Sequence, residues 1–131
     1  MNERNNLTKE WFKKAENDLL EAKIILQSES DLLPLDTVCF HCQQATEKFL
    51  KAFLIYHGVS FPYTHLLESL IDQCKEIDGD FGDLDYVNEL TPYAVEIRYS
   101  DDCEEIQLIE AQNAFDIACR AKSFIISKVK L

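Results

Sequence analysis

Two cysteines three positions apart, with a histidine between them, suggest metal or thiol chemistry. Cys39, His41 and Cys42 lie in the stretch CFHCQQATEK, and such a group could hold a metal ion or form a redox pair. A structural zinc site needs four ligands, usually from two paired motifs, and the chain has no second motif of this kind. Apolar residues recur at helical spacing around Cys42, where a cysteine acts as a small apolar side chain. We therefore expect packing rather than a metal ion or cofactor.

A second group of residues could bind an anion or move a proton. Glu47 and Lys51 lie four residues apart in QQATEKFLKAFL, a spacing that places them side by side on a helix. They could form an ion pair on the helix surface, which contributes only about 0.3–0.5 kcal/mol. Alternatively, they could belong to a binding site with Lys48 and with His65, which begins the segment HLLESL.

Arg98 is isolated in an acidic region. It is the only basic residue between Lys75 and Arg120, and Tyr99 follows it. Asp18 falls within an apolar helical stripe, and a carboxylate buried there without a partner would cost several kcal/mol. Arg98 could be that partner, in which case the two residues form a structural ion pair.

The composition indicates an acidic globular protein. The chain has 131 residues, of which 47% are apolar and 28% charged, and its net charge is −11. This charge disfavours nonspecific binding to a phosphate backbone and favours a protein partner with a basic face. No N-terminal apolar run and no stretch of about 18 apolar residues occurs. We expect a cytoplasmic protein with free thiols and no membrane contact.

Hydrophobic periodicity predicts long helices. Only three glycines and three prolines interrupt the chain, and apolar residues recur at steps of three and four. The second helix is apolar on more than one side, which indicates a central position, whereas DGDFGDLD is typical of an acidic loop. We predict an all-α fold, an antiparallel bundle of four to five helices in a single domain over 1–131, with helices at about 8–29, 36–57, 64–77, 85–99 and 102–128.

Four ordered segments resemble the landmarks of the HEPN domain family, named for higher eukaryotes and prokaryotes nucleotide-binding. The segments are WFKKAENDLLEAKIIL, CFHCQQATEKFLKAFLIYHG, THLLESL and PYAVEIRYS. The resemblance spans about residues 8–125 and implies a helical bundle that usually forms a homodimer. The matching positions are Trp11, Ala15, Asp18, Leu19, Ala22, Gln44, Ala45, Glu47, Lys48, Lys51, His65, Leu70, Arg98 and Tyr99.

The resemblance implies two kinds of activity. Many bacterial and archaeal members act with a minimal nucleotidyltransferase in a two-component system, often a toxin–antitoxin pair, and some members are thought to bind nucleotides. Other members are metal-independent ribonucleases, which use an arginine and a histidine a few positions later. Here Arg98 is followed by YSDDCEEIQ, and no histidine follows it in the chain. Acidic residues at that place would repel a phosphate.

The resemblance therefore favours a non-catalytic protein that binds a minimal nucleotidyltransferase, with or without a nucleotide. The alternative is a ribonuclease toxin with an altered catalytic set, in which His65 works with Arg98. In the first case the binding residues would be Glu47, Lys48, Lys51, His65, Arg98 and Tyr99.

Overall fold

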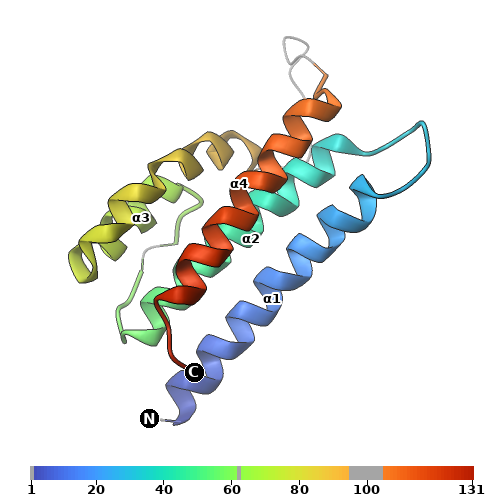
Figure 1. The fold of residues 1–131 in the computed structure, drawn as a ribbon. Helices are drawn as coiled ribbons and strands as arrows, with labels where there is room; N and C mark the ends of the chain where they lie inside the picture. The colour runs from blue at the N-terminus through green and yellow to red at the C-terminus, as the bar shows by residue number, and fades with distance from the viewer. Residues whose placement is uncertain (1, 62, 95–104) are drawn as a thin grey trace.

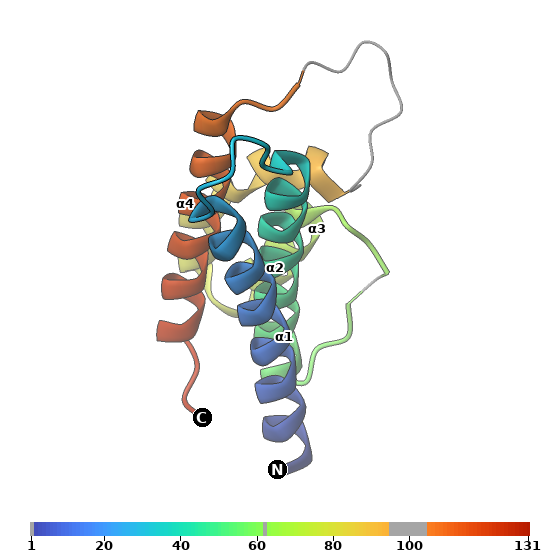
Figure 2. The same ribbon diagram turned by 90° about the vertical axis from the view of Figure 1, so that its right-hand side faces the viewer.

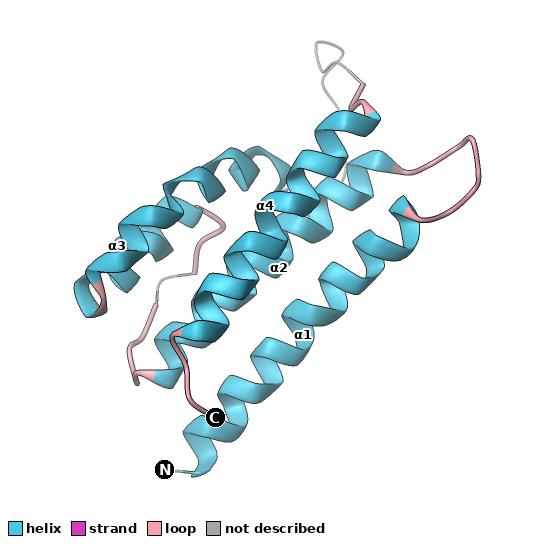
Figure 3. Ribbon diagram, in the orientation of Figure 1, coloured by secondary structure: helices cyan, strands magenta, loops and turns pink. Residues whose placement is uncertain are grey.

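The described part of the fold consists of four α-helices and one 3₁₀ helix. The structure is a computed structural model that describes residues 2–61, 63–94 and 105–131. No strand occurs in these ranges (Figure 3), which confirms the predicted all-α class. None of the described helices combines the length and apolar composition that a bilayer span requires. The elements are α1 (Asn2–Leu26), α2 (Leu35–Tyr56), α3 (Leu67–Ile77), the 3₁₀ helix η1 (Gly79–Ala94) and α4 (Leu108–Ser127).

Helix α2 lies at the centre of the bundle. It contacts α1, α3, η1 and α4, and α1 runs in the opposite direction to both α2 and α4 (Figures 1 and 2). Aromatic contacts connect these layers. The Phe53 ring on α2 lies 4.3 Å from the Phe81 ring on η1, measured between centroids, and Phe81 lies 5.1 Å from Phe124 on α4. The central position predicted for this helix is confirmed, because its apolar residues cover more than one face.

The acidic stretch at 78–85 is not the loop that the sequence predicted. Most of it belongs to η1, whose residues Phe81, Leu84, Val87 and Leu90 are all buried. These four residues are spaced three apart, which is the periodicity of a 3₁₀ helix. The aspartates between them stay largely at the surface. The many acidic residues of this stretch indicated a loop, although its apolar residues recur with a period of three.

Helix α1 begins earlier than the sequence predicted. It starts at Asn2 rather than near Thr8. The Thr8 hydroxyl donates to the carbonyl oxygen of Arg4 over 2.9 Å, and the Thr8 side chain is buried. A threonine that bonds to the carbonyl one turn earlier continues a helix instead of capping it. The additional turns place Arg4 and Leu7 beside the end of α2.

Gly58 ends α2 through a Schellman motif. Its φ is +69°, in the left-handed region that residues with a Cβ rarely adopt. The Gly58 amide donates to the carbonyl of Ile55, and the Val59 amide donates to that of Leu54. These two bonds satisfy carbonyl groups at the helix end and direct the chain toward α3.

Replacing Gly58 by alanine should destabilise the protein by about 1–2 kcal/mol, because alanine is strained at a positive φ. Urea unfolding of Gly58→Ala measures the loss. Gly79→Ala is the matched control, since no atom lies within 4 Å of a Cβ added there. Equal stabilities for the two variants would contradict the role assigned to Gly58.

Candidate functional site

Polar residues of α2 fall on two lines along the helix. Gln43, Glu47 and Lys51 follow one another at four-residue steps, so they lie along one face. His41 and Lys48 are seven residues apart and lie along another. Because α2 is surrounded by other elements, each line meets a neighbour instead of solvent.

The first line forms a network with the segment that precedes α3, which we call the Glu47 cluster: Gln43, Glu47, Lys51 and His65. Lys51 Nζ donates to one Glu47 oxygen over 3.0 Å, and His65 Nδ1 lies 2.8 Å from the other. Gln43 Nε2 lies 3.2 Å from both that second oxygen and the His65 carbonyl oxygen. Three side chains of this network therefore converge on the Glu47 carboxylate.

The Glu47–Lys51 pair is buried, so its interpretation as a surface ion pair is wrong. The side chains of Glu47 and Lys51 are only 5% and 8% exposed. Two aromatic rings cover the lysine: its Nζ lies 6.0 Å from the centroid of Trp11 on α1 and 5.3 Å from that of Phe61. Both distances suit a cation–π contact. The sequence predicted the ion pair correctly, but it did not predict that the pair is buried.

The surroundings of Glu47 favour its ionised form. Burial alone would raise the pKa of this carboxyl group, because a charge is costly away from water. Hydrogen bonds from His65, Lys51 and Gln43 outweigh that effect and hold the pKa below its ordinary value. Glu47 is therefore a fixed negative charge within the bundle.

The second line joins α2 to α1 in what we call the Asp18 cluster: Asp18, Glu21, His41 and Lys48. His41 Nδ1 lies 2.9 Å from an Asp18 oxygen, and its Nε2 lies 2.8 Å from a Glu21 oxygen. Lys48 donates to the other Asp18 oxygen. Asp18 is only 8% exposed, so the prediction that it needs a partner is confirmed. Its partners within the described ranges are His41 and Lys48.

The same cluster contains the donor atoms of a potential cation site. One ligand atom each from Asp18, Glu21 and His41 lie within 4.8 Å of one another, and zinc accepts carboxylate and imidazole ligands. However, these groups are already joined by ion pairs and hydrogen bonds, and the Lys48 ammonium group lies against Asp18. The arrangement is satisfied as an ionic network that connects two helices.

The cysteines beside His41 pack into the core. Cys39 and Cys42 are both fully buried, while His41 faces α1. Burial raises the pKa of the Cys42 thiol well above its usual range, which disfavours the thiolate that metal binding and thiol exchange require. The prediction that Cys42 serves as a small apolar residue is confirmed.

The structure brings together some of the predicted site residues and separates others. Glu47, Lys51 and His65 meet in one cluster, whereas Lys48 belongs to the other. Arg98 and Tyr99 lie outside the described residues, so the proposed pairing of Arg98 with Asp18 stays a prediction. His65, by contrast, has a defined carboxylate partner in Glu47.

Sequence reasoning missed three participants: Gln43, Glu21 and His41. The four-residue steps of Gln43, Glu47 and Lys51 were a usable signal for the first. The seven-residue step from His41 to Lys48 was a usable signal for His41, but its position between two cysteines suggested a metal motif instead. Glu21 could not be found in this way, because it is 57% exposed and its contact with His41 depends on how α1 packs.

Comparison with known proteins agrees with this architecture. The family model of the HEPN domain matches residues 8–128. The chain belongs to the HEPN domain family. This is a helical family with nucleotide-binding and ribonuclease members, and its match covers all of α2, α3, η1 and α4 and most of α1. No curated protein and no solved structure matched the chain.

Glu47→Gln should lower the free energy of unfolding by about 3 kcal/mol, because it leaves the Lys51 ammonium group buried beside a neutral amide. Urea unfolding at neutral pH measures the change. Asp85→Asn is the control, since it removes an ion pair in which Asp85 is 65% exposed and 3.4 Å from Lys75. That variant should lose less than about 1 kcal/mol, and a comparable loss in both would argue against the importance of the buried pair.

The stability difference between the wild type and Glu47→Gln should also depend on pH. The folded protein holds the pKa of Glu47 below its ordinary value of 4.5. The stabilisation that the ionised Glu47 provides is therefore complete above pH 4.5. It is lost as the pH falls through the lower folded-state pKa. Unfolding measured at neutral pH and at several points below pH 4.5 should therefore show the difference shrinking. A difference that stays constant would contradict this assignment.

Proposed function

We propose that this HEPN protein is a non-catalytic binding partner of a minimal nucleotidyltransferase. The pair forms a two-component system of the toxin–antitoxin kind, in which this chain acts as a homodimer and can carry a nucleotide. The observation that carries the proposal is that the predicted binding side chains already have partners. Lys48, Lys51 and His65 each contact a carboxylate.

A carboxylate already beside each cation weakens its attraction for a phosphate group. A ribonuclease must stabilise negative charge as it develops on the scissile phosphate. Lys51 is buried against Glu47, and Lys48 is 26% exposed against Asp18. These side chains connect helices and would have to leave their partners to bind RNA. The free energy needed to break these ion pairs supports a role in protein binding over RNA cleavage.

The charge of the surface supports docking to a basic protein. The net charge is −11. Asp83 is exposed on η1, and Asp80 and Asp85 are exposed beside it, although Lys128 pairs with Asp80 and Lys75 pairs with Asp85. Such a face attracts a basic protein surface and repels nucleic acid. We place the docking of the nucleotidyltransferase on this acidic side.

One contact favours the alternative function, a metal-independent ribonuclease. Since the Glu47 carboxylate can only accept hydrogen bonds, His65 Nδ1 is the donor, and Nε2 of the neutral ring keeps a lone pair. The His65 side chain is 51% exposed, so Nε2 could act as a general base, oriented by Glu47. Arg98 would have to supply the positive charge.

Co-purification and an RNA assay separate the two functions. The untagged chain is co-expressed with a tagged minimal nucleotidyltransferase encoded beside its gene. We expect the two proteins to elute together at low salt and to dissociate progressively as the ionic strength rises, because salt screens surface attraction. We also expect purified wild type to leave RNA intact, as do Arg98→Ala and His65→Ala.

RNA cleavage that requires both Arg98 and His65 would overturn the non-catalytic proposal. If His65 were the general base, its replacement by alanine would lower the rate about 10²–10⁴-fold. His57→Ala is the matched control, since His57 contacts the rings of Phe53 and Tyr56 and does not belong to the Glu47 cluster. Failure to co-purify at low salt would count against the partner.

A further inference from the structure

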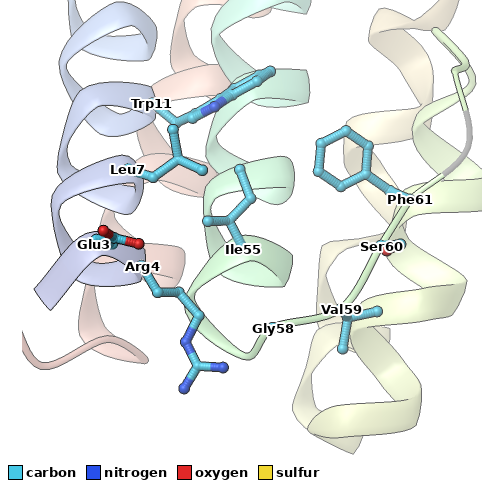
Figure 4. Close-up of a pocket in the computed structure, with 9 residues that line it drawn as sticks. All are labelled: Glu3, Arg4, Leu7, Trp11, Ile55, Gly58, Val59, Ser60 and Phe61. Atoms are coloured by element: carbon cyan, nitrogen blue, oxygen red, sulfur yellow. The ribbon is translucent and has the colours of Figure 1, made fainter. Parts of the chain in front are cut away.

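A wide apolar groove, open to solvent, lies between the first turns of α1, the end of α2 and the segment after it, and we call it the chamber. Its volume is about 560 Å³, which is within the usual range of small-molecule sites, roughly 300–1,000 Å³. Figure 4 shows Leu7 and Trp11 on one side, Val59 and Phe61 on the other side, and Ile55 between them. The walls are therefore mostly aliphatic and aromatic.

A single guanidinium group provides the positive charge of the chamber. Arg4 extends from α1 toward Gly58, below the apolar side chains (Figure 4). No carboxylate of the described residues lies within ion-pair distance of it, although the neighbouring Glu3 also borders the chamber. Figure 4 draws the Glu3 carboxylate beside α1 and the Arg4 guanidinium farther out. An exposed arginine without an ion pair, at the edge of an apolar wall, suits a ligand with one acidic group.

The arrangement of the aromatic rings argues against a stacked nucleobase. Trp11 and Phe61 meet edge to face, with centroids 6.0 Å apart and planes at 78°. A base cannot be sandwiched between two rings that already contact each other. Lys51 Nζ lies near both rings and is paired with Glu47, so it does not offer a second cation for a chain of phosphates. The chamber suits an aliphatic body better than a polar planar one.

The charged edge of the chamber lies outside the part of the chain that matches the family. The HEPN match begins at residue 8, whereas Arg4 and Leu7 precede it. These residues reach the chamber because α1 starts at Asn2. The chamber is therefore not built from the family's matched segment alone.

We propose that this chamber binds a small amphipathic monocarboxylic acid. The aliphatic body lies against Leu7, Ile55 and Val59, and the carboxylate pairs with Arg4. Burial of apolar surface supplies most of the binding free energy, while the ion pair selects an acid over a neutral molecule of the same length.

Trp11 makes the proposal directly testable, because it is the only tryptophan of the chain and borders the chamber. Decanoate, kept below its micelle-forming concentration, is titrated into the full chain while tryptophan fluorescence is recorded. We expect a saturable change. In Arg4→Gln the apparent Kd for decanoate should rise about three- to fivefold, the effect of a partly exposed ion pair, while that for decanol stays unchanged.

Two further variants complete the design. Leu7→Asp places a carboxylate in the wall and should weaken the binding of decanoate more than Arg4→Gln does. Lys13→Gln removes a charge from the exposed side of α1, outside the chamber lining, and should bind as the wild type does. Circular dichroism checks that all variants keep the helical fold.

Three results would overturn the proposal. They are the absence of a saturable change with decanoate, equal affinity of the wild type and Arg4→Gln for decanoate, and a response to adenosine monophosphate at lower concentration than to decanoate. The third result would assign the chamber to a nucleotide. None of them bears on the nucleotidyltransferase partner, although the third would agree with the nucleotide that the proposed function allows. The acid-binding proposal and the docking proposal can therefore fail independently.

Discussion

The buried ion pair between Glu47 and Lys51 is the constraint on which much of the bundle depends. Two charges inside a central helix are tolerated only when each is compensated and the remaining polar atoms find hydrogen bonds. His65 and Gln43 provide the remaining hydrogen bonds to Glu47. Trp11 and Phe61 cover Lys51. The pair therefore fixes where α1 and the segment before α3 can lie.

The Asp18 cluster places a similar demand on the packing of α1 against α2. Asp18 on α1 contacts His41 and Lys48 on α2, which are 23 and 30 residues away in sequence, so sliding α1 along α2 would separate Asp18 from these partners. Buried ionic groups often add little net stability compared with apolar packing of the same volume. We infer that both clusters mainly select one arrangement among several that apolar contacts alone would allow.

Trp11 connects the ionic interior with the proposed acid-binding chamber. It contributes to the cover of Lys51 and to the wall that faces Arg4. The HEPN segment of the chain supplies α2 and its charged residues, while the first turns of α1 supply Arg4 and Leu7. A binding event in the chamber would thus contact a residue that also packs on the Glu47 cluster. This proximity gives a physical connection between the two regions.

The sequence by itself determined the helical class, the central helix with its end near residue 57, and the HEPN resemblance, because these depend on local periodicity, on the few helix-breaking residues and on ordered motifs. It also showed that Asp18 needs a partner. Only the tertiary structure decided that His41 and Lys48 contact it, that Glu47 and Lys51 are buried, and that an acidic stretch forms η1. The reason is that burial and long-range pairing depend on which neighbour covers a face, and residue spacing along one helix carries no information about that neighbour.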